Sequence, residues 1–248
     1  MLPPLEQCKI KTIMEIVKRV AVITARWLFI LCLPVMLLTA SISLAVNSQW
    51  LYEYGFGKYN VRQTTGLADS ELKKTASGLI NYFNSGEEFI DLTVIKDNQP
   101  FTLFNEREIV HLRDVKGLIW LDYRVMLGTG IYVLLYAVVS LCWLAEACRR
   151  RLAIATVAGS GLTLGLILLL GLVAVLDFRE FFLWFHLVSF ANDLWLLDPS
   201  RDYLIMLFPQ GFWYDATVFL ALTTVALAVL LAGVSGGYLL ITRRKTLT

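Results

Sequence analysis

Four long apolar runs, which carry charged residues only at their margins, constrain this chain more than any other feature of its sequence. They cover residues 27–46, 123–144, 152–176 and 216–241. A helix needs about 20 apolar residues to cross the ~30 Å hydrocarbon core of a bilayer, and each run meets that length. With 57% hydrophobic residues and a mean hydropathy of +0.64, the chain as a whole also exceeds the apolar share of soluble domains. The sequence therefore predicts a membrane protein with four transmembrane helices.

The first apolar run could also be part of a cleavable signal peptide. Basic residues precede it, and Ser43-Leu44-Ala45 resembles a small-x-small cleavage site. The apolar core of a signal peptide is usually only ~7–15 residues, whereas 27–46 is long enough to span a bilayer. Pro34 fits this interpretation because transmembrane helices tolerate a proline kink. We therefore expect 27–46 to remain as the first span.

Basic residues flank the spans unevenly and predict an orientation. They cluster before the first span, between the second and third, and after the fourth, namely Lys9, Lys11, Lys18, Arg19, Arg26, Arg149, Arg150, Arg151, Arg243, Arg244 and Lys245. The positive-inside rule assigns these clusters to the cytoplasm. This places 1–26, 145–151 and 242–248 inside, and 47–122 and 177–215 outside.

Charge and cysteine content exclude several classes of function. The net charge is only +2, and no Lys/Arg stripe lies outside the clusters at the span ends, so we expect no nucleic-acid partner. Cys8, Cys32, Cys142 and Cys148 all lie outside the two long polar segments. They therefore predict neither a disulfide framework nor a CxxC metal or redox site, and we expect free thiols.

The first exposed segment, 47–122, has the pattern of a small folded cap. Apolar and polar residues alternate over 89–95 as in a half-buried strand, a turn follows at 97–100, and 101–104 is a second short apolar stretch. Asn105 with Glu108 three residues later forms an approximate capping box at the start of a helix. The expected fold is thus a mainly α membrane protein, a four-helix transmembrane bundle with a small extracytoplasmic α+β cap and an interfacial aromatic-rich segment.

The helix that starts after Asn105 carries a histidine between two carboxylates. Glu108, His111 and Asp114 follow at intervals of three, so they project from one face on adjacent turns. Carboxylates beside an imidazole can orient it and raise its basicity, as a general base requires. The same residues could equally form a solvated, salt-bridged helix face.

The second exposed segment, 177–215, begins with the aromatic-rich stretch Asp177 to His186, which is too charged to span a membrane and suits its interface. His186, Ser189 and Asp193 follow at helical spacing, and Asn192 is adjacent. The chain contains two histidines, and both fall in the segments predicted to lie outside.

Three kinds of chemistry compete for these residues. A zinc site could use both histidines with Glu108, but no HExxH motif is present, so we expect no metal. A serine hydrolase could use Ser189 with His186 and an Asp, but no GxSxG elbow is present. An acyl transfer in which the substrate supplies its own nucleophile needs only a base, an acid and alignment at the lipid surface. A non-enzymatic membrane sensor or assembly protein is a further alternative.

Two segments carry a resemblance to a known family. They are Phe104-Asn-Glu-Arg-Glu-Ile-Val-His-Leu-Arg-Asp-Val-Lys116, and Trp184 to Pro199 continuing through Arg201 to Trp213. Together with the four spans, they resemble the bacterial lipoprotein intramolecular transacylase family. The resemblance implies transfer of an acyl chain from the sn-2 ester of a diacylglyceryl group to the α-amino group of the same N-terminal cysteine. The product would be a lyso-form lipoprotein.

The resemblance also implies which residues act and where. It assigns catalysis to His111 and His186, in the cytoplasmic membrane of a bacterium with the active site on the extracytoplasmic face. The expected partners are the diacylglyceryl-modified lipoprotein and membrane lipids, and no cofactor is expected. Supporting residues are Glu108, Arg113, Asp114, Ser189, Asn192 and Asp193. Of these, Asn192 or Arg113, or alternatively a backbone N–H, could stabilise the tetrahedral oxyanion.

Overall fold

The computed structural model of the chain describes residues 4–142 and 146–245, with side chains over 12–142 and 146–243. Some residues named in the predictions lie outside the described side chains, namely Cys8, Lys9, Lys11, Arg244 and Lys245, and residues 143–145 of the second span and its loop. Within the described residues, the thiols of Cys32, Cys142 and Cys148 are free.

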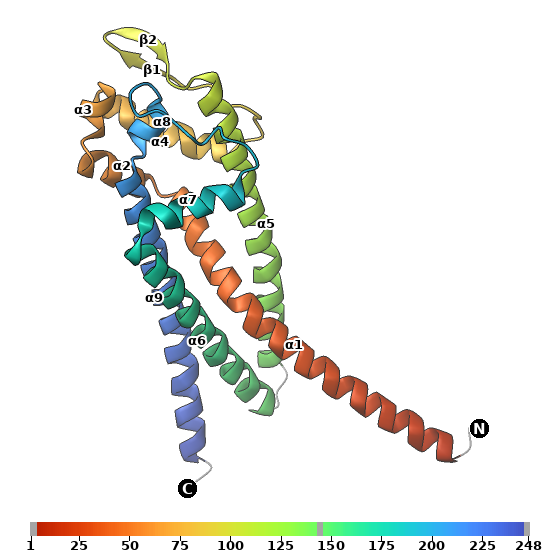
Figure 1. Ribbon diagram of the computed structural model, residues 1–248. Coiled ribbons are helices and arrows are strands. Elements are labelled where there is room, and N and C mark those ends of the chain that lie inside the picture. The colour runs from red at the N-terminus through yellow and green to blue at the C-terminus, as the bar shows by residue number, and fades with distance from the viewer. Residues whose placement is uncertain (1–3, 143–145, 246–248) are drawn as a thin grey trace. The chain divides into compact units, whose positions relative to one another are not determined.

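In the described part of the chain, four helices are long and apolar enough to cross a membrane (Figure 1). They are α1 (Pro4–Val46), α5 (Glu106–Cys142), α6 (Glu146–Leu176) and α9 (Gln210–Lys245). All four extend beyond the apolar runs, because backbone hydrogen bonds continue into their polar ends. As a result, residues 146–151, which we expected in a loop, are already helical. The predicted mainly α fold with four apolar helices is confirmed.

The first compact unit comprises Met1–Leu37, Met126–Leu166 and Val225–Thr248. Its core is apolar and includes Phe29, Leu33, Val133 and Ala228. Gly159 allows α6 to approach α1 closely, since a Cβ added there would lie 2.9 Å from Cδ2 of Leu33. Close backbone approach at a small residue is the usual way in which membrane helices pack.

The second compact unit comprises Leu38–Val125 and Ile167–Thr224. It contains three helices that the sequence did not lead us to expect in the polar stretch after the first span: α2 (Gln49–Lys58), α3 (Val61–Thr65) and α4 (Asp69–Asn84). It also contains α7 (Phe178–Ser189) and α8 (Tyr203–Leu207). One core joins α2, α3, α4 and α8, built on large side chains such as Tyr52, Leu79 and Phe208, whereas α7 buries none of its residues.

A two-stranded antiparallel hairpin completes the α+β character of this unit (Figure 1). It consists of β1 (Thr93–Lys96) and β2 (Gln99–Thr102), with Lys96 paired to Gln99. Asp97 and Asn98 both have positive φ, 51° and 62°, as the two central residues of a tight hairpin turn require. The strand predicted at 89–95 begins later, at Thr93. The turn makes Lys96 the last residue of the strand, and pairing extends back from it to Thr93, which lies opposite Thr102.

A buried carboxylate ties the start of α5 to the rest of the second unit. The predicted capping box is present: Asn105 N donates to Oε2 of Glu108 at 2.8 Å, and Glu108 N donates to Oδ1 of Asn105 at 3.1 Å. The other oxygen of Glu108 accepts a hydrogen bond from Leu204 N at 2.6 Å, at the beginning of α8. Glu108 is thus a link between α5 and α8, with no exposed surface.

Removing this carboxylate should destabilise the fold. Glu108→Ala leaves the N–H groups of Leu204 and Asn105 without their acceptor, at a cost of about 3 kcal/mol in the free energy of unfolding. Thermal unfolding in detergent, followed by loss of helical circular dichroism, measures the effect. Glu106→Ala is the matched control, because Glu106 lies in the same first turn but is exposed. Equal melting temperatures for the two variants would contradict the role given to Glu108.

Candidate active site

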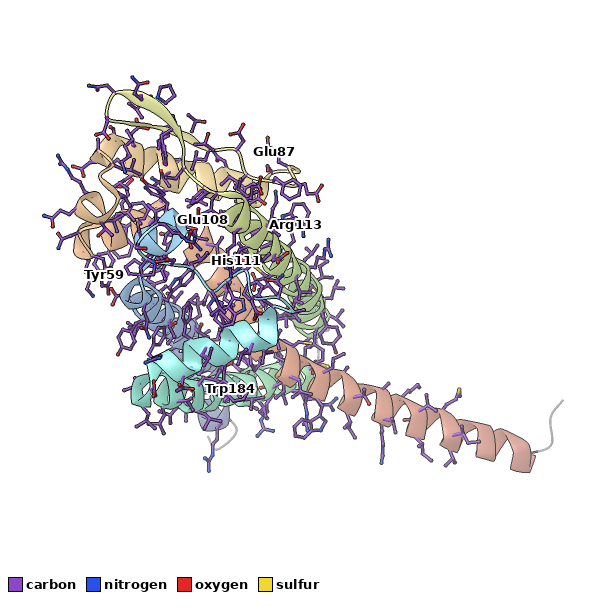
Figure 2. All side chains as sticks on the ribbon, turned by 45° about the horizontal axis from the view of Figure 1, so that its top comes forward. Tyr59, Glu87, Glu108, His111, Arg113 and Trp184 are labelled. Atoms are coloured by element: carbon purple, nitrogen blue, oxygen red, sulfur yellow. The ribbon has the colours of Figure 1, made fainter. Side chains whose placement is uncertain are left out.

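The structure brings together the two histidines that are 75 positions apart in the sequence. His111 lies on the second turn of α5 and His186 on the last turn of α7, and both belong to the second unit. Their ring centroids are 6.4 Å apart and the ring planes differ by 26°. In Figure 2, Glu108, His111 and Arg113 follow one another along α5, and Trp184 marks α7. The pair is the centre of the candidate site.

Aromatic side chains surround both imidazoles. Phe190, directly after α7, lies 5.0 Å from the ring of His111 and 5.6 Å from that of His186. Phe182 and Trp195 lie 4.4 and 4.9 Å from His186. These rings shield the histidine pair from much of the solvent, although His186 remains partly exposed, so hydrogen bonds and charges in the site act in a medium of lower dielectric constant than water.

The backbone of α7 selects one tautomer of His186. Nδ1 of His186 lies 2.8 Å from the carbonyl oxygen of Phe182, one turn earlier in the helix. A carbonyl oxygen can only accept, so Nδ1 carries the proton in the neutral ring. Nε2 is therefore left with a free lone pair, ready to accept a proton or a hydrogen bond.

His111 is the more deeply buried of the two, with 6% of its surface exposed. Within the described residues its Nδ1 is buried and has no hydrogen-bond partner. The residue lies in the charged beginning of α5, ahead of the apolar run that starts at Tyr123. Burial, together with the nearby His186, lowers the pKa of His111 to about 4, although Asp114 partly opposes this shift. At neutral pH the ring is a neutral imidazole.

The two carboxylates expected to flank His111 have different roles. Both oxygens of Glu108 accept backbone N–H groups, so Glu108 anchors the helix and does not hydrogen-bond to the histidine; burial raises its pKa. Asp114 acts on His111 through its charge and accepts a hydrogen bond from Nδ2 of Asn192 at 2.9 Å. Asn192 therefore joins the loop after α7 to α5.

Three of the other expected supporting residues are placed as follows. Arg113 forms ion pairs with Glu88 at 3.5 Å and Asp114 at 3.7 Å. Ser189 is the last residue of α7, and in the described part of the chain no hydrogen bond joins it to His186. We expected Asp193 to continue the helical spacing of His186 and Ser189. It lies in the loop instead, because α7 ends at Ser189. The backbone oxygen of Asp193 accepts a hydrogen bond from Nη2 of Arg107.

Some residues that build the site were not among the candidates predicted from the sequence. Asp202 is 1% exposed and accepts hydrogen bonds from Nδ2 of Asn105 at 2.9 Å and from Asp198 N at 2.7 Å. It thereby fixes the loop that presents Trp195 to His186. Asp198 and Asp202 both lie within the Asp-Pro-Ser-Arg-Asp stretch of the second motif, which was the available signal.

The arrangement can move protons beside an apolar surface. Outward-facing residues of α7 are strongly apolar, with Trp184 63% and Val188 82% exposed. Over 12–142 and 146–243, no group of three His, Cys, Asp or Glu side chains is placed to hold a metal ion. The two imidazoles are thus the groups that the described site offers for acid–base chemistry.

Titration of the two histidines tests this environment. We expect both rings to be neutral at pH 7, since burial lowers both pKa values, with His111 taking up its proton near pH 4 and His186 below its ordinary pKa. Because an unfolded chain protonates these groups from about pH 6.5 downwards, their burial removes stability as the pH falls from about 6.5 toward 4.

With only two histidines in the chain, ¹⁵N-histidine labelling resolves both. The protein carries an affinity tag without histidine, and His186→Gln assigns the signals. If the ring of His111 titrates at or above pH 6.5, its surroundings are accessible to water and the burial described above is contradicted.

Comparisons with known proteins identify relatives of this chain. The family model of the lipoprotein intramolecular transacylase Lit matches residues 27–213. An uncharacterised protein of Aquifex aeolicus is 32% identical over 136 residues, which is 54% of this chain and 57% of that protein, so the match spans little more than half of the relative.

Solved structures share the fold. The membrane-integral lipoprotein intramolecular transacylase of Bacillus cereus superposes with a TM-score of 0.72 at 19% identity, over 91% of this chain and 97% of that chain. A variant of it with one histidine replaced by alanine gives 0.71 at 20% identity, over 90% and 94%. At this identity the structures show the fold alone, that of a multi-pass membrane protein.

Proposed function

Because the chain belongs to the lipoprotein intramolecular transacylase family, we propose that it is an acyltransferase of bacterial lipoproteins. In the proposed reaction, the acyl chain on the sn-2 oxygen of the diacylglyceryl group moves to the α-amino group of the same N-terminal cysteine. The product is the lyso-form lipoprotein, with an N-acyl group and a single acyl chain left on the glyceryl group. The substrate is thus both donor and acceptor.

The observation that carries this proposal is the pair of imidazoles 6.4 Å apart in an aromatic surround. Both reacting groups are on one molecule, so the enzyme needs no nucleophile of its own. It must hold amine and ester together, which exploits the large effective molarity of aligned groups. It must also move protons, which two neutral imidazoles can do.

His186 is suited to be the proton acceptor. The α-ammonium of the cysteine must lose a proton before its nitrogen can attack the ester carbonyl, and Nε2 of His186 has the free lone pair. The C–N bond then forms and the bond from the acyl carbon to the sn-2 oxygen breaks. The departing oxygen takes up a proton, which the imidazolium of His186 can return. In total, ammonium and ester give amide, alcohol and one released proton.

His111 is suited to stabilise the charge that develops in between. As a neutral imidazole with a low pKa, it can donate an N–H to the carbonyl oxygen as this becomes the oxyanion. Its Nδ1 has no partner among the described residues, so a ring nitrogen is available to the substrate. Asn192 and Arg113, which the sequence also offers for this role, instead contact Asp114 and Glu88, respectively.

The proposed location follows from charge and surface. By the positive-inside rule, the basic span ends support a topology with both termini in the cytoplasm and the histidine pair on the extracytoplasmic face of the bacterial cytoplasmic membrane. There the apolar surface of α7, including Trp184 and Val188, would contact the lipid in which the substrate's acyl chains lie.

Mass spectrometry of a model lipoprotein tests the activity. In a host without N-acylation, the intact chain should give an N-acyl, S-monoacylglyceryl cysteine. His186→Ala and His111→Ala should each leave the free-amine diacylglyceryl form, with at least a ~100-fold loss of rate.

His111→Asn and Ser189→Ala separate the competing interpretations. Asparagine keeps an N–H donor but cannot act as a base, so partial activity of His111→Asn supports an oxyanion role. Ser189→Ala should retain full activity, since acyl transfer here uses no serine nucleophile. Loss of activity in Ser189→Ala, or release of free fatty acid by the intact chain, would favour a hydrolase. A membrane-inserted chain that leaves the substrate unchanged would refute the proposal.

A further inference from the structure

A basic pocket lies in the first unit, which does not contain the histidine pair. Its volume is about 330 Å³, and it is lined by four cations and two aliphatic side chains: Lys18, Arg19, Val22, Ile23 and Arg26 of α1, and Arg151 of α6. Among the residues with described side chains, no carboxylate lines it. A volume in this range is enough for a small ligand or the headgroup of a larger one.

The sequence spacing explains how α1 builds its wall of the pocket. Arg19, Ile23 and Arg26 follow at intervals of four and three, so they share one helix face. α6 adds Arg151 from its own basic end. Cationic heads and aliphatic stems therefore line one continuous surface.

Among the described residues, the arginines of the pocket have no carboxylate partner. Nε of Arg26 is buried and has no hydrogen-bond partner within the described part of the chain. Over 12–142 and 146–243, neither Arg19 nor Arg151 has a carboxylate within ion-pair distance, and Lys18 pairs only with exposed Glu15 at 3.3 Å. A buried guanidinium nitrogen without an acceptor costs free energy, so the pocket is suited to receive an anion.

The position of the pocket indicates what kind of anion it receives. Arg26 directly precedes the apolar run 27–46, and Arg151 directly precedes 152–176, so both mark the depth at which a helix enters the hydrocarbon. Trp27, the next residue of α1, is 54% exposed, as is typical of aromatic anchors at headgroup level. A ligand here would have its charge at the interface and its apolar part in the bilayer.

We propose that this pocket binds the phosphate of an anionic phospholipid, with Arg26 and Arg151 as its principal contacts. Guanidinium groups bind phosphate oxygens in pairs, and Val22 and Ile23 would lie against the start of the acyl chains. The four positive charges favour a lipid with net negative charge over a zwitterionic one. The bound lipid would hold α1 and α6 together at their basic ends, independently of the transacylase reaction.

Native mass spectrometry of the full chain in detergent tests the site. Phosphatidylglycerol should remain bound as one adduct, and phosphatidylcholine should bind several-fold more weakly. Arg26→Gln and Arg151→Gln should each weaken phosphatidylglycerol retention about fivefold. Arg150→Gln is the matched control, because it removes the same charge from an exposed residue next to Arg151 that does not line the pocket.

The outcomes distinguish a specific lipid site in the pocket from nonspecific attraction of anionic lipid to basic residues. Arg150→Gln should retain the lipid as the unchanged chain does, and Arg26→Lys should retain part of it. Equal losses in all three glutamine variants, or equal retention of the two lipids, would show only diffuse attraction and overturn the proposal. Displacement of the lipid by millimolar inorganic phosphate would instead show a site for free phosphate. Helical circular dichroism confirms that each variant is folded.

Discussion

The hydrogen bonds of one buried carboxylate hold the parts of the candidate site in register. Glu108 caps α5, the helix that carries His111, and the same side chain accepts from the first turn of α8. The carboxylate is fully desolvated, which by itself is unfavourable, and backbone N–H groups compensate for the lost hydration. Asn105 connects this link to Asp202, which fixes the loop behind Trp195. A polar network thus positions an otherwise aromatic site.

The histidines benefit from that arrangement because they are held on rigid elements in dry surroundings. α5 continues without interruption from the motif with His111 into an apolar span, so the histidine stands on an extension of a membrane helix. α7 fixes the tautomer of His186 through its own backbone. Burial lowers the pKa of both rings and so favours their neutral form at physiological pH, as the proposed base and the proposed neutral hydrogen-bond donor require. Pre-organisation of this kind is how an active site without a nucleophile of its own can accelerate a reaction.

The sequence predicted what depends on local patterns. Apolar run length identified the four long helices, and the Asn105 and Glu108 spacing identified the cap that begins α5. The sequence predicted less well what depends on tertiary contacts. Glu108 was expected to serve His111, but its second partner is Leu204, almost a hundred positions away.

Other differences have the same origin. Helical spacing suggested that Asp193 continues α7, yet the helix ends at Ser189. The following loop is instead held by Arg107, which donates to the backbone oxygen of Asp193, and by Asn192, which donates to Asp114. α4 was missed although its sequence carried a signal, since Leu72, Ala76, Leu79 and Phe83 follow at helical spacing and form its buried face. α2 and α3 were not expected, because their apolar residues become a recognisable face only against the core that contains Phe208 and Phe212. Such contacts have no signature within a single segment.

The central claim is that one substrate molecule provides both amine and ester, while the protein contributes positioning and two imidazoles. A crossover experiment with the purified chain tests it most directly. Two forms of a model lipoprotein are mixed, one with an isotopically heavy sn-2 acyl chain and a heavy cysteine, the other fully light. The account predicts that heavy acyl chains appear only on heavy cysteine and light chains only on light cysteine. Heavy acyl chains on light cysteine would show transfer between molecules or through an acyl-enzyme, and would contradict the account.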